Sequence, residues 1–349
     1  MEFSRISTLF GLVALGVGSV FSGCSNPTPN VSNLDALPLL GVDSLMLPQD
    51  YLGGDVVSMR RLPDESYLFS DYMSRALQTY RAGDEAVSQI GRHGEGPGEY
   101  RRPIYVRLGE NGEIAFSDIS NPLIKFILPD GSQTGVLAHT HGGGRKFDLL
   151  EDVIYVQSTE RYLLYAYERT GDQIAELFPI DESYGRFAQR LSGGGVAVAG
   201  HRVFTMNSLE PRIYVYDVST QRTSTLSPTA WKRYRANLDR DRVERMTLEN
   251  WDQASDDFAV FMDLDKIILD NDNLLVTTLR YRGKMFLNIL RLDGEVLYEC
   301  EIDSWFVGSQ LDLLFFVGVN EDTDQSTLLA YRYVSEEPGK GNEEVQTQR

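Results

Sequence analysis

The stretch Ile90-Gly91-Arg92-His93-Gly94-Glu95-Gly96-Pro97-Gly98-Glu99-Tyr100 is the most informative part of this chain. It contains four glycines and a proline, and a strand-like pattern lies on either side of it. Glycine adopts backbone angles that are closed to other residues, and proline stiffens a turn. The stretch is therefore predicted to be a tightly shaped loop between two β-strands.

A degenerate repeat of strand pairs runs through the middle of the chain. Its Ser-Asp ends at Asp71 and Asp118 are 47 residues apart (118 − 71), and its turn glycines Gly83, Gly131 and Gly171 are separated by 48 and 40. A period of roughly 40 to 50 residues with several strands per repeat is typical of β-propeller blades. The predicted pairs are 66–71 with 76–80, 114–118 with 123–128, 153–156 with 163–167, 203–206 with 213–217, 274–279 with 285–290, and 313–319 with 328–333.

Chain length favours six blades. Residues 51–334 number 284, and removing an insertion of 30 residues at 228–257 leaves 254, or roughly 42 per blade. Blades packed around an axis bury both faces, which one blade alone cannot do, and closing the ring requires an N-terminal strand, expected near 42–47, to pair with the last blade. The predicted fold class is all-β, a six-bladed β-propeller with a short helical insertion.

The repeat and the glycine-rich motif together resemble the six-bladed, NHL- or TolB-like propeller lipoproteins of bacteria with an outer membrane. The resemblance covers roughly residues 40–334, and the pattern G-x-G-P-G-E-aromatic at 94–100 carries it. It implies a propeller fold and a location in the cell envelope. It leaves the activity open, because many members of this family have no assigned activity.

The glycine-rich motif has two interpretations. In the structural one it links the last strand of one blade to the first strand of the next, and Glu99 accepts hydrogen bonds from loop amides. In the functional one, polar side chains of the motif line a propeller face, where ligands usually meet loop residues. These binding-face candidates are Arg92, His93, Glu99, Arg101 and Arg102. No helix pattern follows the motif, which excludes a dinucleotide-binding fingerprint.

The N-terminus has the pattern of a targeting segment. Residues 9–21 are apolar but too short to span a membrane as a mature helix, and Phe-Ser-Gly-Cys at 21–24 resembles a bacterial lipobox, whose cysteine is acylated. Phe21 departs from the usual leucine, so a plain cleaved signal peptide and an uncleaved anchor stay open. We predict a signal peptide at 1–23, a lipidated Cys24 with a tether over 24–40, the propeller at 41–334, and a disordered tail at 335–349.

Charge and cysteine content exclude several classes of protein. A net charge of −18 without a basic run argues against a nucleic-acid partner, because phosphate binding needs clustered Lys and Arg. The acidity is read as a solubility feature, with an acidic-face cation site as the alternative. If Cys24 is lipidated, Cys300 has no intrachain partner, so no disulfide is expected. Cys300 lies in an alternating strand pattern and is read as a buried structural thiol.

The insertion at 228–257 has a helix-like period with many charged residues, including the cationic group Lys232, Arg233 and Arg235. One interpretation is a helical pair that packs on a propeller face. The other is a lid or a partner-docking element.

Two further groups are candidates for metal chemistry. His139 and His141 would point the same way on a strand, as two metal ligands could, although no third ligand is near. The acidic group Asp263, Asp265, Asp270 and Asp272 does not fit an EF-hand and is read as a solvated turn. The glycine-rich segment 193–200 is read as a flexible lead into the fourth blade.

No nucleophile elbow, P-loop or zinc-protease motif is present in the sequence. The sequence therefore favours a binding module for a protein, peptide or glycan. We expect it to be lipid-anchored in the bacterial cell envelope, in the outer membrane and facing the periplasm. Catalytic residues are unknown, and no cofactor is expected beyond a possible divalent cation. The alternative is a metal-assisted enzyme, either a lyase or a lactonase-like hydrolase, with its site in the propeller channel.

Overall fold

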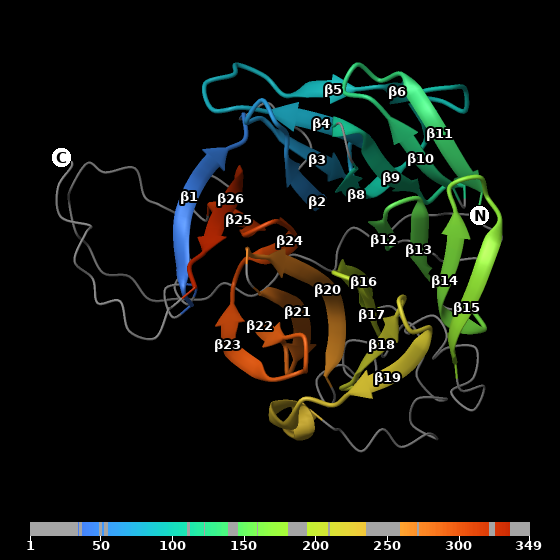
Figure 1. Ribbon diagram of the computed structural model, residues 1–349. Coiled ribbons are helices and arrows are strands. Elements are labelled where there is room, and N and C mark those ends of the chain that lie inside the picture. The colour runs from blue at the N-terminus through green and yellow to red at the C-terminus, as the bar shows by residue number, and fades with distance from the viewer. Residues whose placement is uncertain are drawn as a thin grey trace, which may run out of the picture.

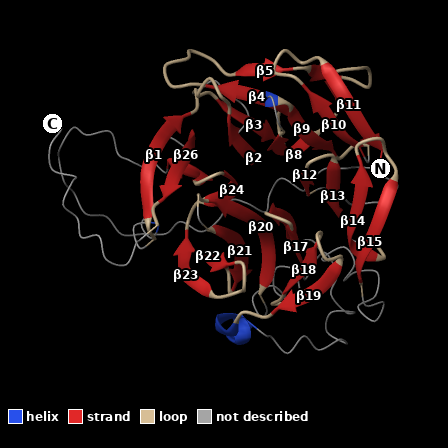
Figure 2. Ribbon diagram, in the orientation of Figure 1, coloured by secondary structure: helices blue, strands red, loops and turns tan. Residues whose placement is uncertain are grey.

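The computed structural model describes residues 34, 37–48, 51, 55–109, 112–121, 123–138, 146–158, 160–180, 194–208, 210–234, 259–270, 272–320 and 325–335. Six four-stranded antiparallel sheets follow one another around a central axis, so the chain is a six-bladed β-propeller (Figure 1). Nearly all of the regular secondary structure in the described chain is β-strand (Figure 2). None of its helical segments is long and apolar enough to cross a bilayer.

In each blade the first strand lies nearest the axis and the fourth lies at the perimeter (Figure 1). Blade 1 comprises β2 (Val56–Arg61), β3 (Tyr67–Asp71), β4 (Ala76–Tyr80) and β5 (Ser88–Ile90). Blade 2 comprises β8 (Pro103–Leu108), β9 (Ile114–Asp118), β10 (Leu123–Ile127) and β11 (Gln133–Ala138). Blade 3 comprises β12 (Phe147–Leu150), β13 (Val153–Gln157), β14 (Tyr162–Glu168) and β15 (Gln173–Pro179).

The second half of the ring repeats this plan. Blade 4 comprises β16 (Gly195–Ala199), β17 (Arg202–Met206), β18 (Ile213–Asp217) and β19 (Arg222–Leu226). Blade 5 comprises β20 (Val260–Ile268), β21 (Asn273–Tyr281), β22 (Lys284–Arg291) and β23 (Val296–Ile302). Blade 6 comprises β24 (Trp305–Gln310), β25 (Leu313–Asn320), β26 (Gln325–Tyr333) and the N-terminal β1 (Leu39–Met46). Two short strands, β6 (Arg92–His93) and β7 (Glu99–Tyr100), lie between blades 1 and 2.

The ring closes through its two ends. β1 pairs antiparallel with β26, from Leu39 opposite Tyr333 to Met46 opposite Thr327. This confirms the expected N-terminal closing strand, which begins three residues earlier than predicted. The twelve predicted strand segments also coincide with the second and third strands of all six blades.

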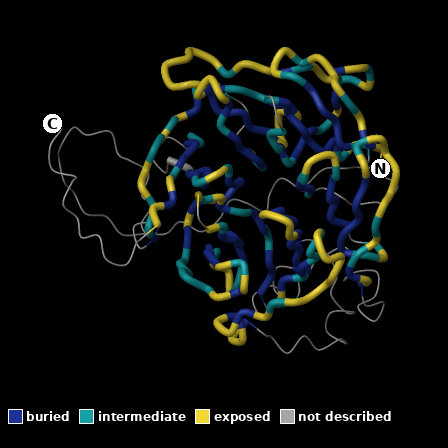
Figure 3. Tube along the Cα trace, viewed as in Figure 1, coloured by how far each residue is buried: buried dark blue, intermediate teal, exposed yellow. Residues whose placement is uncertain are grey.

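Apolar clusters between neighbouring blades form the core. Each of six clusters of buried side chains joins two successive blades, and the last of them joins blade 6 to blade 1. Between blades 1 and 2, for example, Leu77 packs with Tyr100 and Phe116, and the rings of Tyr100 and Phe116 meet edge to face at 5.6 Å. Burial is greatest in the strands inside the ring, and exposed segments gather at the perimeter and in turns (Figure 3).

The alternating strand direction gives the ring two distinct faces. Connections after the second and fourth strands of a blade lie on one face, here called the loop face, and turns after the first and third strands lie on the other, the turn face. The inner strands therefore start at the loop face and run along the channel. Register shifts bend β2, β8, β20 and β24 near their starts, and such bulges re-aim the side chains that follow.

Three segments differ from the sequence-based expectations or test them in part. Asp263 and Asp265 lie in the inner strand β20 and not in a solvated turn, whereas Asp270 and Asp272 flank the turn into β21. Residues 195–199 form the buried strand β16 and not a flexible lead, because small side chains fit against β20. Of the insertion, Thr229–Tyr234 forms a 3₁₀-helix with Trp231 fully buried, and residues 235–257 lie outside the described residues.

Candidate functional site

The glycine-rich motif lies between blades 1 and 2 and contacts both. The Tyr100 hydroxyl is buried, donates a hydrogen bond of 2.6 Å to the Ile90 carbonyl and accepts one of 3.2 Å from the Leu77 amide. The Gly98 amide donates to Oε1 of Gln133 in blade 2 at 3.3 Å. The motif therefore ties the outer strand of one blade to the outer strand of the next.

Glu99 holds the loop of the motif in shape. Its Oε2 accepts a hydrogen bond of 2.8 Å from the Gly96 amide, and its Oε1 lies 2.6 Å from Nε of Arg92. The Gly96 amide and then the Arg92 guanidinium hold the pKa of this carboxyl below its ordinary value. A side chain at Gly94 would overlap the Glu99 carboxylate, which explains the glycine there. The expected acceptance of loop amides by Glu99 is confirmed.

A group of side chains on the loop face, here called the loop-face patch, consists of the exposed Tyr72, Met73 and Arg101 and the half-buried Arg102. The guanidinium carbon of Arg102 lies 4.8 Å from the centroid of the Tyr72 ring, and its Nη1 donates to the Tyr72 hydroxyl at 3.2 Å. Tyr72 is 38% exposed and Met73 is 60% exposed. Arg101 forms an ion pair with Glu95.

The two Ser-Asp ends of the sequence repeat build this patch. Asp71 Oδ1 accepts hydrogen bonds of 2.8 Å from the amides of Met73 and Ser74. Asp118 accepts hydrogen bonds of 3.0 Å from the amides of Arg101 and Arg102. A carboxylate at the end of a second strand thus shapes the connection beside it in both blades. This role of the aspartate accounts for the Ser-Asp ends that recur in the sequence repeat.

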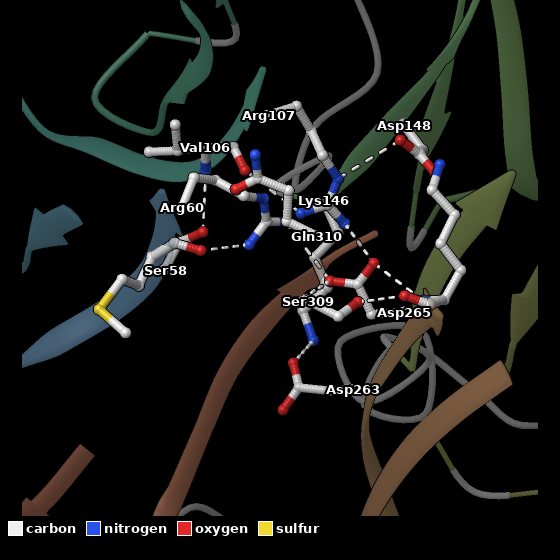
Figure 4. Close-up of polar contacts among 12 residues, drawn as sticks. Ser58, Arg60, Val106, Arg107, Lys146, Asp148, Asp263, Asp265, Ser309 and Gln310 are labelled. Carbon is white, nitrogen blue, oxygen red and sulfur yellow. Dashed lines mark hydrogen bonds and ion pairs between the residues drawn. The ribbon is translucent and has the colours of Figure 1, made fainter. Parts of the chain in front are cut away.

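Charged side chains cross the central channel of the ring. They form the channel cluster, which consists of Arg60, Arg107, Asp148, Asp265 and Lys266. Figure 4 labels the first four of these. Arg107 of blade 2 lies 3.6 Å from Asp265 of blade 5, its opposite in the ring, and 3.4 Å from Asp148 of blade 3. Lys266 lies 2.5 Å from Asp148, and Arg60 lies 3.4 Å from Asp265. Contacts between blades that are not neighbours can run only across the axis.

Backbone amides donate further hydrogen bonds to the two buried carboxylates. The Val198 amide of blade 4 donates to Asp148 at 2.6 Å, and the Ser309 amide of blade 6 donates to Asp265 at 3.1 Å. All six blades therefore contribute to one polar network. Nearer the loop face, Lys146 lies 2.5 Å from Asp263 and 5.3 Å from the centroid of the Tyr105 ring.

The pKa values of the two carboxylates in the channel cluster, Asp148 and Asp265, are shifted in opposite directions. Burial alone would raise the pKa of Asp148, but Lys266 and Arg107 outweigh it and hold that pKa below its ordinary value. Burial raises the pKa of Asp265, and the neighbouring Asp148 adds to the rise while Arg107 opposes it. Burial likewise opposes the charge of Lys146, but Asp263 outweighs it and raises the pKa of that amine.

The five binding-face candidates do not form one surface. Arg92 and Glu99 pair with each other in the motif between the blades, and His93 is exposed in β6. Only Arg101 and Arg102 belong to the loop-face patch. The sequence reading missed Tyr72 and Met73, although their place directly after the Ser-Asp end was a usable signal.

The remaining candidates are the cysteines and the groups considered for metal binding. His139, His141 and Cys24 lie outside the described residues. Cys300 is a free thiol of intermediate exposure in β23, and burial raises its pKa to about 11. Within the described part of the chain, no group of three or more His, Cys, Asp or Glu side chains is arranged to hold a metal ion. Sequence reading also missed the channel cations Arg60, Arg107 and Lys266.

Comparisons with solved structures agree on the fold. A Bacteroides fragilis protein described as exported has a TM-score of 0.61 and 15% identity, covering 87% of this chain and 97% of its own. A DUF4221 family member from Bacteroides vulgatus has a TM-score of 0.58 and 11% identity, covering 84% and 97%. A catalytically inactive virginiamycin B lyase from Staphylococcus aureus, solved with quinupristin, has a TM-score of 0.52 and 8% identity, covering 82% and 98%.

At these identities the likeness shows the propeller fold alone. No family model matches the chain, and no curated protein matches it.

Proposed function

We propose that this chain is an envelope-anchored lipoprotein whose propeller binds a protein, peptide or glycan partner through its loop face. The observation that carries the proposal is the loop-face patch, where Arg102 covers the exposed ring of Tyr72 beside the exposed Met73. Tyr, Met and Arg are enriched in the cores of protein interfaces, and Tyr and Arg often dominate their binding energy. The exported bacterial neighbour of the same fold is compatible with this role.

The channel cluster supports a binding role because it braces the scaffold. Ion pairs and amide hydrogen bonds from all six blades fix the inner strands relative to one another. A surface on a rigid scaffold loses little conformational entropy on binding. Loop residues carried by such a scaffold are where binding usually takes place.

The course of the chain also favours the loop face. β1 begins at the turn-face end of blade 6, because Leu39 pairs with Tyr333 at the end of β26. A tether from a lipidated Cys24 would therefore reach the propeller from the turn face. An anchored molecule would present its loop face away from the membrane, toward a partner in the periplasm.

Site-specific photo-crosslinking in the native envelope tests the binding role. A photoreactive residue replaces Met73, which is 60% exposed on the loop face, or Leu311, which is 59% exposed in a turn-face turn. We expect an adduct of discrete mass from position 73 and none from position 311. Arg102→Ala should weaken the adduct at position 73, since the Tyr72 ring loses its cover. Equal adducts at both positions, or none at position 73, would contradict the proposal.

Metabolic labelling tests the anchor separately. Cells expressing the full chain receive a radiolabelled fatty acid, and incorporation is compared for the wild type, Cys24→Ser and Cys300→Ser. Label should persist in Cys300→Ser and disappear in Cys24→Ser, because only Cys24 lies in the lipobox. Absence of label from the wild type would reject lipidation and leave the loop-face proposal standing.

A further inference from the structure

A cavity of about 750 Å³ lies on the turn face between blades 2 and 3. Its apolar walls include Leu108 at the end of β8, Phe126 of β10, Leu149 of β12 and Ile154 of β13. Small-molecule sites are typically concave, of about 300–1,000 Å³, and combine apolar walls with a few polar groups. Neither the glycine-rich motif nor the loop-face patch takes part in it.

Arg169 is a cation of the chain that lies on the cavity wall. Its guanidinium carbon lies 4.3 Å from the centroid of the Phe126 ring, and its Nη2 pairs with the Glu113 carboxylate. Glu113 also accepts a hydrogen bond from the Thr134 hydroxyl. A cation over an aromatic ring and next to a carboxylate is a favourable arrangement in a partly desolvated site. The chain thus places a cation of its own on part of the cavity wall.

The lining carries more negative than positive charge. Glu113 is matched by Arg169, whereas Glu151 and Asp152 add two exposed carboxylates from the turn between β12 and β13. The formal charge of the lining is therefore three carboxylates against one guanidinium, or −2. An anionic occupant would be repelled, and a neutral one would leave these carboxylates without a counter-charge.

We propose that this cavity binds a small organic amine with an apolar body, whose protonated nitrogen lies toward Glu151 and Asp152. The apolar body would contact Leu108, Leu149 and Ile154, and would displace water from them. This site is on the face opposite the proposed partner surface, so it is independent of the proposed function.

Binding of three matched probes to the full chain tests the proposal by calorimetry. The probes are 2-phenylethylammonium, the neutral 2-phenylethanol and the anionic 3-phenylpropionate, which share the phenylethyl group. We expect the amine to bind in preference to both analogues. The double variant Glu151→Gln, Asp152→Asn should weaken amine binding about tenfold, equivalent to about 1.4 kcal/mol. Leu149→Trp, which places a larger side chain on the cavity wall, should weaken amine binding.

Glu65→Gln is the matched control. Glu65 is an exposed carboxylate in the corresponding turn of blade 1, with a φ of 70° against 53° for Glu151. Its substitution should leave amine binding unchanged, and thermal melting should show that all variants fold. Equal weakening by Glu65→Gln would mean that the overall charge attracts the amine, and the proposal would fail. It would also fail if the neutral probe bound as well as the amine, or if no probe bound.

Discussion

The guanidinium of Arg60 occupies the space that a side chain at Gly308 would need. A Cβ on Gly308 would overlap Nη1 of Arg60, and Gly308 also has a φ of +135°, which favours glycine. Arg60 belongs to blade 1 and Gly308 to blade 6. The joint between the first and last blades is thus built around a charged side chain that enters the channel.

Gly308→Ala should therefore destabilise the protein by about 2–4 kcal/mol, because backbone strain adds to a clash with a buried guanidinium. Gly171→Ala is the control, since Gly171 also has a positive φ, +105°, but nothing within 4 Å of an added Cβ. We expect about 1 kcal/mol for the control, the cost of the backbone strain alone. The measurement is urea unfolding of both variants. Equal losses would show that Arg60 moves aside freely.

The opposite pKa shifts of Asp148 and Asp265 predict opposite pH dependence. The lowered pKa of Asp148 means that its charge stabilises the fold above the unfolded value of about 3.9, and that this stability is lost as pH falls through the folded value. The raised pKa of Asp265 means that its contribution is fully present below about 3.9 and is lost as pH rises through the folded value.

Asp148→Asn and Asp265→Asn separate these contributions. Asp148→Asn should cost about 3–5 kcal/mol at pH 7, because it leaves Lys266 and Arg107 underpaired in a buried site. The gap between this variant and the wild type should narrow as pH falls. The stability of Asp265→Asn relative to the wild type should increase as pH rises. Urea unfolding from pH 3 to pH 8 measures the stability of both variants relative to the wild type. If the two differences changed in the same direction with pH, the opposite pKa shifts of Asp148 and Asp265 would be refuted.

The sequence predicted the blades because their second and third strands follow local rules. Both are buried apolar runs ended by polar turns, as in Ile114–Asp118 before the turn to β10. The inner strands lacked that signal. β8 carries Arg107 and β20 carries Asp263, Asp265 and Lys266, and these charges interrupt the apolar pattern expected of a buried strand. Only the closed ring supplies the counter-charges that permit their burial.

The candidate site was harder to predict for the same reason. The motif around Glu99 was correctly placed between two blades, since glycine spacing is a local signal. Arg102, which follows the motif, contacts Tyr72 on the loop face, thirty residues earlier in the chain (102 − 72 = 30), and this contact has no local signal. Contacts across blades such as Arg107 to Asp265 join residues 158 apart (265 − 107), and no sequence spacing encodes them.

Tyr100→Phe distinguishes the two interpretations of the glycine-rich motif. Loss of the hydroxyl leaves the buried Ile90 carbonyl and Leu77 amide without this partner, so we expect a loss of about 1–3 kcal/mol in unfolding free energy. Photo-crosslinking from position 73 should stay at the wild-type level. Arg102→Ala should do the reverse, with little change in stability and a weaker adduct. A Tyr100→Phe variant that folds with full stability but loses the adduct would instead support a binding role for the motif.

A buried side-chain hydrogen bond from Trp231 joins the start of the insertion to blade 5, beside the contacts that Arg233 and Tyr234 make with Glu299. Trp231 Nε1 donates to Asn288 Oδ1 at 3.1 Å, and the Trp231 ring packs against Phe261 with centroids 4.8 Å apart. Both Trp231 and Asn288 are fully buried. Trp231→Phe should cost about 1–3 kcal/mol because it leaves Oδ1 of Asn288 without this donor. Asn288→Leu should cost a similar amount because it leaves Nε1 of Trp231 without an acceptor.

The double variant Trp231→Phe, Asn288→Leu completes a double-mutant cycle. Because it removes both polar partners, its loss of stability should be smaller than the sum of the two single losses by about 1 kcal/mol or more. Urea unfolding gives the three losses. Strictly additive values would mean that this hydrogen bond contributes nothing, and that the remaining contacts, the packing against Phe261 and the contacts of Arg233 and Tyr234 with Glu299, hold the start of the insertion on the blade.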